Sequence, residues 1–327
     1  MAYQSGDTIL DDHYNIFVQG GAGAVDHNTA NVNTLWGAGT SDKGYGETGS
    51  LLSTVSAGST ITATQWANLL NRCTTLANHQ GTSLTSITNP TTGDTISAYA
   101  ALSTNISTLT TNRGNAAANG SDITANGTVT TSSTWDVSAI NEQTITFDSA
   151  DAARYFWNAG GMIRLSWSLT GGSDNKSTEW ADLLTKSGTI AITGGTATQT
   201  INAVAYTGTT KVGGSGTPTT LATTTGWYDL STSYVEVFKQ YADSAPYTAN
   251  YIKVEIKATS STVLSVKTSL IDDAADTTSP GGLGDALDVV DGTLTQTMVV
   301  RPPSSTYLTS AAWGTPAMAS SSWSLSS

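Results

Sequence analysis

The stretch IRLSWSLT at residues 163–170 decides the fold class of this chain. Its apolar residues, Ile163, Leu165, Trp167 and Leu169, alternate with polar ones, so an extended chain here has one apolar side and one polar side. Because successive side chains of a β-strand point to opposite faces, this alternation predicts a strand with one buried face.

Patterns of the same period recur between residues 136 and 302. The segments 252–257 and 264–270 both alternate apolar with polar residues. Further strands are predicted at 143–147, 189–193, 199–206, 227–230, 234–241 and 294–300, with short helices at about 149–158 and 178–186. Because so many strands each have one apolar face, we expect a two-sheet β-sandwich over residues 136–302.

Helical spacing dominates the N-terminal part of the chain instead. Thr62 and Gln65 have the spacing of a capping box, and the apolar pattern that follows ends near Gly81. A second helical pattern follows Asp94, and a short helix is predicted near 11–18. The apolar residues of the two longer patterns are Trp66, Leu69, Leu70, Cys73 and Leu76, then Ile96, Tyr99, Leu102, Ile106 and Leu109. The expected fold class is therefore mainly β with a smaller helical N-terminal part.

Composition divides the chain into four parts. They are an N-terminal anchoring region (1–111), a polar linker (112–135), the β-sandwich (136–302) and a low-complexity C-terminal arm (303–327). The linker is predicted because this segment is polar and rich in turn dipeptides. The arm has two interpretations: a disordered terminus, or a segment that docks Trp313 and Trp323 into a neighbouring subunit.

Charge and cysteine content exclude several classes of protein. The 327 residues include 13 basic and 25 acidic ones, a net charge of -12, while threonine and serine make up about 30%. A negative surface repels phosphate backbones and anionic lipid, so we expect neither nucleic-acid nor membrane binding. The single cysteine, Cys73, excludes an intrachain disulfide and a cysteine-rich zinc site. Residues 1–10 contain no apolar signal segment, so we expect a protein made without a secretion signal.

The motifs that carry catalysis or metal binding are weak in this sequence. Gly44, Gly46 and Gly49 form a G-x-G-x-x-G match, but no strand precedes it as in a dinucleotide-binding unit, so a loop is favoured. The histidines, His13, His27 and His79, lack the spacing of metal ligands. We therefore predict no catalytic, cofactor or metal residues, and no enzyme activity.

Acidic residues provide the remaining candidates for a site. Asp11 and Asp12 precede His13, and paired carboxylates of this kind are considered for glycoside cleavage, though only as a minor alternative. Asp272, Asp273 and Asp276 follow a predicted strand, but they lack the alternating pattern of an EF-hand. A solvated turn is the preferred interpretation at 272–276, with weak cation binding as the alternative.

Five segments resemble virion structural proteins of tailed phages, especially contractile-tailed cyanophages. They are YQSGDTILDDHYNIF (3–17), TVSAGSTITATQWANLLN (54–71), ARYFWNAGGMIRLSWSLTGG (153–172), STEWADLL (177–184) and SLIDDAADTT (269–278). The resemblance covers most of the chain in order, except the linker and the arm. It implies a place in the tail, neck or fibres of the particle, assembly in the host cytoplasm and release by lysis. It supplies no catalytic residues.

The expected function is therefore that of a phage virion structural protein that acts through contacts between subunits. A homo-oligomer, preferably a trimer, is predicted because the 96–109 stripe is narrow for burial by one chain. The predicted contact residues are Trp66, Leu69, Leu70, Ile96, Tyr99, Leu102, Ile106, Leu109, Trp313 and Trp323. The alternative function is a receptor-binding adhesin that recognises host-surface glycans through exposed aromatic side chains.

Overall fold

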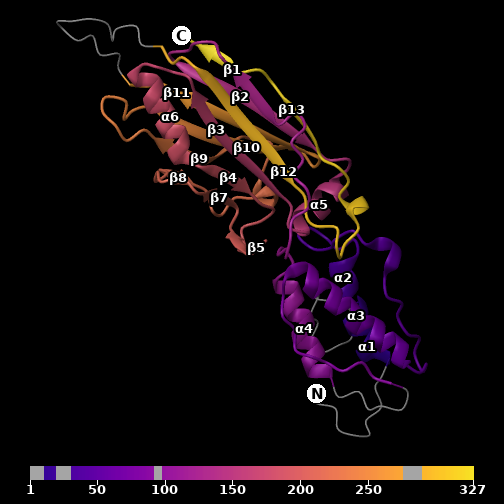
Figure 1. Ribbon diagram of the computed structural model, residues 1–327. Helices are drawn as coiled ribbons and strands as arrows, with labels where there is room; N and C mark the ends of the chain where they lie inside the picture. Colours follow the sequence, from indigo (N-terminus) through magenta and orange to yellow (C-terminus); the bar gives the residue numbers. More distant parts are fainter. Residues whose placement is uncertain (1–10, 20–30, 92–97, 275–288) are drawn as a thin grey trace, which may run out of the picture.

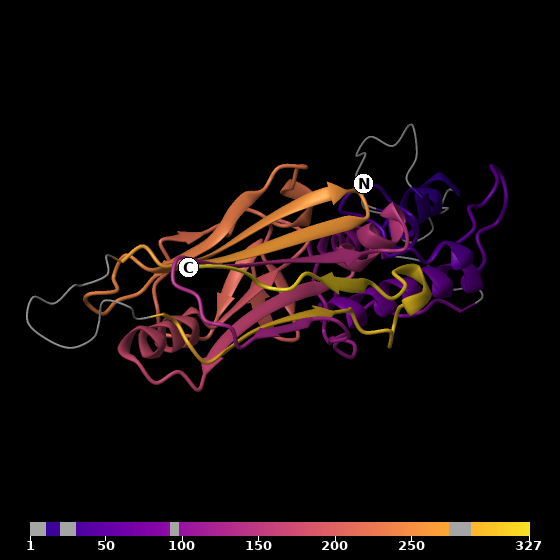
Figure 2. The ribbon, with the colours of Figure 1, turned by 90° about the horizontal axis from the view of Figure 1, so that it is seen from above.

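The computed structural model describes residues 11–19, 31–91, 98–274 and 289–327, and it confirms a mainly β fold with a smaller helical N-terminal part. The helical region lies at one end of an elongated β-sandwich, and the C-terminus lies near the other end (Figures 1 and 2). In the described part of the chain, no helix has both the length and the apolar character needed to cross a bilayer.

Within its described residues, the N-terminal region contains the α-helices α1 (Asp11–Gln19), α2 (Val32–Trp36), α3 (Ala63–Gln80) and α4 (Tyr99–Thr111). The capping box is confirmed, because the Thr62 side chain accepts from the Gln65 N–H while the Gln65 side chain accepts from the Thr62 N–H. Gly81 ends α3 with a φ of 65°, a left-handed conformation that glycine adopts without a steric penalty. The predicted helix near 11–18 is also present as α1.

Extended segments between these helices are held by asparagine side chains. Asn15 of α1 donates to the Val55 carbonyl at 2.8 Å and accepts from the Val55 N–H at 2.8 Å. Asn33 of α2 holds Leu52 in the same way, and Asn105 of α4 holds Thr85. Each amide copies the paired hydrogen bonds of a β-ladder, so the extended chain satisfies its backbone groups without a strand partner.

Two antiparallel sheets form the sandwich. The smaller has the order β1 (Thr128–Thr131), β12 (Thr293–Arg301), β3 (Met162–Thr170), β4 (Thr189–Ile192) and β7 (Thr209–Val212). The larger has the order β13 (Ala317–Ser320), β2 (Ser138–Thr146), β11 (Val263–Ile271), β10 (Tyr251–Ser260), β9 (Val235–Tyr241) and β8 (Thr220–Leu221), with β14 (Ser324–Ser326) also paired to β2. A separate hairpin contains β5 (Gln199–Ile201) and β6 (Val204–Tyr206).

The alternation in 163–170 has the predicted effect. Ile163 and Leu165 are fully buried and Trp167 and Leu169 are 7% exposed, whereas the intervening residues are half-buried or exposed. Two helices complete the sandwich: α5 (Ala150–Asn158) connects β2 to β3, and α6 (Asn175–Ser187) packs against β3, β9 and β10. Because α6 contacts strands of both sheets, it closes the space between them (Figure 1).

A buried amide network joins the two sheets. Gln296 of β12 accepts from Trp167 Nε1 at 2.7 Å and donates to Asn141 Oδ1 at 3.1 Å and Gln143 Oε1 at 2.6 Å, both on β2. Gln143 donates in turn to the Gly127 carbonyl. All three amide residues are fully buried. Because each would be costly to bury unpaired, the network favours one alignment of the sheets.

The segment 112–135, predicted as a linker, is part of the sandwich instead. It contains β1, it bridges Ala116 to Ile201 and Ile123 to Val300, and Trp135 is 1% exposed against Trp180 of α6. The prediction was wrong because this polar segment pairs with the sheets through its backbone N–H and C=O groups. Such pairing requires no periodic pattern of apolar residues, so the sequence does not show it.

The C-terminal arm, 303–327, also packs on the sandwich of its own chain. Its strands β13 and β14 pair with β2, and Trp323 donates to the Val129 carbonyl at 3.3 Å. Trp313 and Trp323 are 2% and 8% exposed. Both interpretations of the arm are therefore corrected: its backbone is ordered by β2, and its tryptophans fill spaces within one chain.

The strand predicted at 227–230 is a 3₁₀ helix at Trp227–Asp229. The Asp229 carboxylate accepts from the Gly226 N–H at 3.0 Å, which stabilises a tight turn in place of an extended segment. The strand predicted at 199–206 is the β5–β6 hairpin, with Asn202 and Ala203 at positive φ in its turn.

Candidate functional site

The residues predicted to contact other copies are packed inside one chain. Trp66, Leu69, Leu70, Leu102, Ile106 and Leu109 are at most 8% exposed, and Tyr99 is half-buried beside Phe17 at 4.9 Å between ring centroids. Ile96 lies outside the described residues. The stripe that suggested a trimer is covered because α3 and α4 pack together and α1 covers their end. That reason for a trimer is removed, and the number of copies stays a prediction.

Tryptophans do not provide the predicted exposed platforms for sugars. All nine are buried, with exposed fractions between 0% and 9%. Several pack on one another, such as Trp157 stacked on Trp227 with ring centroids 5.7 Å apart. Trp36, Trp157, Trp180 and Trp227 thus belong to the core. The large area that each indole buries stabilises the fold.

The glycine motif forms a tight loop that packs against α5. Gly44 and Gly46 have φ of 91° and 87°, values that disfavour other residues. A Cβ on Gly46 would lie 2.5 Å from the Tyr155 ring and 2.7 Å from Ala312 Cβ. These glycines therefore allow close contact between the loop and the sandwich, in agreement with the loop interpretation.

One of the predicted acidic candidates, Asp272, is paired with a lysine. The Asp272 side chain is 2% exposed and is paired with Lys176 Nζ at 3.1 Å, and Lys176 also contacts Asp136 at 2.7 Å. Burial raises the pKa of the Asp272 carboxyl, although Lys176 opposes this shift. The lysine ammonium thus occupies the place beside Asp272 where a cation was considered. Asp276 and His27 lie outside the described residues.

His79 lies at the junction between the helical region and the sandwich. Its Nε2 donates to the Ala159 carbonyl at 3.2 Å, and its ring lies 5.1 Å from that of Tyr45. Burial lowers the pKa of His79 to about 4, with the Ala159 hydrogen bond acting in the opposite direction. The imidazole is therefore neutral at pH 7 and acts as a fixed donor between the two parts.

Further hydrogen bonds make this junction continuous. Tyr45 donates to the Arg113 carbonyl at 2.6 Å and accepts from Gln80 Nε2 at 2.9 Å. Asn158, the last residue of α5, donates to the Gly44 carbonyl at 2.9 Å. The two regions thus share buried polar contacts, and the apolar core also continues from one into the other.

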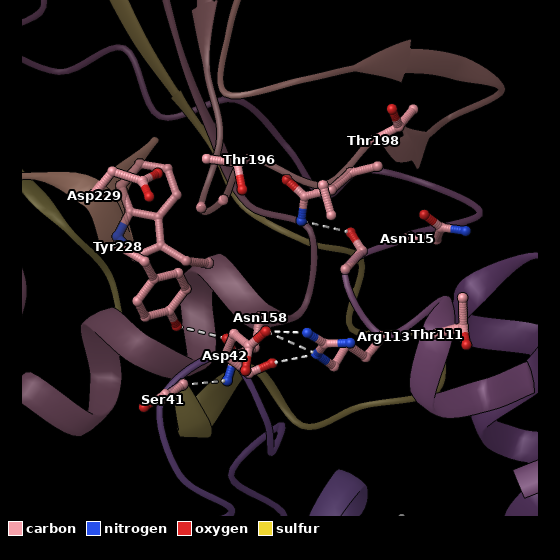
Figure 3. A pocket seen from close by; sticks show the side chains of 16 residues that line it. Ser41, Asp42, Thr111, Arg113, Asn115, Asn158, Thr196, Thr198, Tyr228 and Asp229 are labelled. Carbon is pink, nitrogen blue, oxygen red and sulfur yellow. Dashed lines mark hydrogen bonds and ion pairs between the residues drawn. The ribbon is translucent and has the colours of Figure 1, made fainter. Parts of the chain in front are cut away.

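A pocket of about 360 Å³ opens at this junction. Figure 3 shows its lining, which comes from five segments: the loop at 41–42, the end of α4 with the residues after it, the end of α5, the stretch 194–199 that leads into β5, and the turn at 228–229. The labelled lining residues are Ser41, Asp42, Thr111, Arg113, Asn115, Asn158, Thr196, Thr198, Tyr228 and Asp229. Hydroxyl, amide and charged groups therefore surround one hollow beside an aromatic ring.

Hydrogen bonds fix one side of the pocket. Arg113 pairs with the Asp42 carboxylate, donates to the Asp42 carbonyl at 3.0 Å and donates to the Thr110 carbonyl at 2.9 Å. Tyr228 donates to Asn158 Oδ1 at 2.5 Å, as Figure 3 shows. Burial raises the pKa of the Tyr228 hydroxyl, so this group is a neutral donor at pH 7. The arrangement provides a fixed polar surface for a small ligand.

Sequence reasoning did not find this pocket. Its residues come from segments up to 188 positions apart, taking Ser41 and Asp229 as the limits, and none belongs to a recognisable motif. The only local signals are glycine pairs and turn residues, such as Gly194 and Gly195, which also mark ordinary loops. Only the packing of the helical region against the sandwich brings these side chains together.

No family model, curated protein or solved structure matches this chain.

Proposed function

We propose that the protein is a structural component of a tailed-phage virion, placed in the tail, neck or fibres. The observation that carries the proposal is the end-to-end union of a helical region and a β-sandwich through one continuous core. Figure 1 displays the result as an elongated body with two different ends. Such a body suits a subunit that spans a distance and contacts different neighbours at its two ends.

The sequence resemblance to virion structural proteins supports the same role. The resembling segment 153–172 contains most of α5, the turn at Gly160 and Gly161, and β3, and so leads from the junction into a central strand of the sandwich. Burial of all nine tryptophans stabilises the chain without a disulfide, as a particle outside the cell requires. Contacts with other virion proteins and with further copies then use the surface of this body.

Labelling of intact particles tests the proposal. An antibody against the sandwich, residues 136–302, is applied to purified particles of the phage that encodes this chain, and gold particles are located by electron microscopy. We expect label at one defined place in the tail, neck or fibres, and the chain in the mass spectrum of the particles. Absence of both from purified infectious particles would contradict the proposal.

A further inference from the structure

A second pocket, of about 170 Å³, lies on the outer face of the smaller sheet. Arg164 and Ser166 alternate along β3 with the buried Ile163 and Leu165, so their side chains point away from the sandwich core. Residues in register with them on the neighbouring strands β12 and β4 complete the floor of this outer-face pocket. Its lining residues are Asp122, Arg164, Ser166, Thr189, Thr297 and Val299.

Arg164 brings an unpaired guanidinium to the outer-face pocket. Its Nε is buried without a hydrogen-bond partner, and none of the described residues forms an ion pair or a hydrogen bond with its two Nη atoms. Only Nε is enclosed, so the Nη atoms are the part of the guanidinium that a ligand can reach. Because a guanidinium binds oxyanions through parallel N–H groups, this side of the pocket is suited to an anion.

The carboxylate of the outer-face pocket is already engaged by a different arginine. Arg301 donates from Nε and Nη2 to the two Asp122 oxygens, both at 2.7 Å. These hydrogen bonds lower the pKa of the Asp122 carboxyl, so it is ionised at pH 7. Two guanidiniums thus lie beside one carboxylate, which leaves a local excess of positive charge. The acidic residues elsewhere on the chain are screened beyond about 8 Å at physiological ionic strength.

Three hydroxyl groups add neutral donors around the guanidinium. Ser166, Thr189 and Thr297 are half-buried, and their hydroxyls form no hydrogen bond within the described part of the chain. Each hydroxyl can rotate its O–H toward an acceptor. A guanidinium on one side and hydroxyls on others match the four oxygens of a tetrahedral oxyanion, whereas the two oxygens of a planar carboxylate would leave donors unused.

We propose that the outer-face pocket binds a tetrahedral oxyanion, a phosphate or sulfate group, with Arg164 as its charged donor. The pocket is smaller than a typical site for a drug-sized molecule, so it admits one such group. Binding of a nucleic-acid backbone is a different case, because it requires many cations along a surface. The proposal does not depend on the place of the chain in a particle, because it concerns binding by the isolated protein.

Phosphorus NMR on the full chain tests the proposal. Inorganic phosphate is titrated at constant ionic strength in chloride, and we expect its resonance to broaden and to sharpen again when sulfate is added. Glucose 6-phosphate is the second probe: its binding assigns the pocket to a phosphate group carried by a larger molecule, and its failure to bind assigns the pocket to the free ion. Absence of broadening, or displacement by acetate as effective as that by sulfate, would overturn the proposal.

A pair of charge variants locates the binding. Arg164→Gln removes the positive charge of the pocket. Lys257→Gln, the matched control, removes one positive charge from a half-buried position on the larger sheet, where the ammonium lies 4.2 Å from the centroid of the Tyr234 ring. We expect Arg164→Gln to weaken phosphate binding by at least about tenfold and Lys257→Gln to leave it unchanged.

Removal of a hydroxyl provides a second test that preserves every charge. Thr297→Val keeps the shape of the side chain, so we expect phosphate affinity to fall by about threefold while far-UV circular dichroism stays unchanged. Thr295→Val, on the same face of β12 but outside the pocket, is the control. Equal binding by wild type, Arg164→Gln and Thr297→Val would place the phosphate elsewhere and overturn the assignment. Failure of the labelling experiment on particles would leave these binding results standing, so the two proposals are separable.

Discussion

The helical region and the sandwich provide hydrogen-bond partners for extended backbone in two different ways. In the sandwich, strands pair with strands, and a buried amide network centred on Gln296 joins the sheets. In the helical region, the asparagines of three helices each hold one residue of an extended segment through two hydrogen bonds. The contrast shows that the stabilisation by an amide depends on its position: water cannot replace the hydrogen bonds of the central Gln296, whereas it can replace those of a half-buried amide such as Asn33.

The largest effect is expected from Gln296→Leu. The substitution leaves Trp167 Nε1, Asn141 Oδ1 and Gln143 Oε1 without their partner in a dry core, so we expect the free energy of unfolding to fall by about 4 kcal/mol. Urea unfolding measures the change. Thr295→Val, on the opposite face of β12, is the control and should change stability by less than about 0.5 kcal/mol. Similar losses in the free energy of unfolding for both variants would show that the buried network contributes no more to stability than a half-buried residue of the same strand.

Leu102→Ala probes the apolar core of the helical region. Leu102 is fully buried in α4, so its truncation should cost about 3 kcal/mol through lost burial and the cavity that remains. Ser107→Ala, on the exposed side of the same helix, is the control. Sedimentation of both variants adds a second measurement, because a residue packed within one chain leaves the mass of the assembly unchanged. A smaller assembly for Leu102→Ala alone would place this side chain between copies after all.

The pH dependence of stability tests the junction between the regions. His79 has a folded pKa of about 4 against an ordinary value of 6.5, so the unfolded chain takes up a proton first as pH falls. Its contribution is complete above pH 6.5 and is lost toward pH 4, which amounts to about 2 kcal/mol between pH 7.5 and 5.

The variant His79→Gln isolates this contribution, because glutamine can still donate to the Ala159 carbonyl but does not titrate in this range. Urea unfolding at pH 7.5 and pH 5 is compared for the two proteins. We expect a smaller loss of stability in the variant, by about 2 kcal/mol. Parallel pH profiles would mean that the imidazole is not buried in its neutral form.

Asn33→Ala has the smallest expected effect and completes the comparison of amides. It removes both hydrogen bonds to Leu52, but this segment is half-buried, and water can reach the freed backbone groups. We therefore expect a loss of about 1 kcal/mol, measured by urea unfolding. Asn71→Ala, an exposed asparagine of α3, is the control. A loss as large as that of Gln296→Leu would remove the proposed difference between the regions.

Elements with a strong local period were predictable from the sequence. The alternation in β3, β10 and β11 and the capping box of α3 all act between residues a few positions apart. The prediction of a 227–230 strand failed because an aspartate at its end bonds back to Gly226. The same residues are compatible with an extended chain or with a turn, and the hydrogen bond from the Gly226 N–H to the Asp229 carboxylate selects the turn.

The candidate pocket could not be predicted in this way. Gln199 lies in the wall of the pocket because its Nε2 donates to the carbonyl of Gly114, 85 positions earlier in the chain. Arg113 is neutralised only because the loop containing Asp42 folds over the end of α4. These contacts depend on how the helical region packs against the sandwich, and no periodic pattern in the sequence predicts that packing.

The sequence by itself determined which segments are strands or helices and which of their faces are apolar, because these properties depend on neighbours along the chain. The tertiary structure alone decided that residues 112–135 and the C-terminal tryptophans belong to the sandwich, that the stripe of α4 is covered by its own chain, and that a polar hollow opens at the junction. Backbone pairing and side-chain packing between distant segments follow the register and shape of the whole fold, which polar segments do not encode locally.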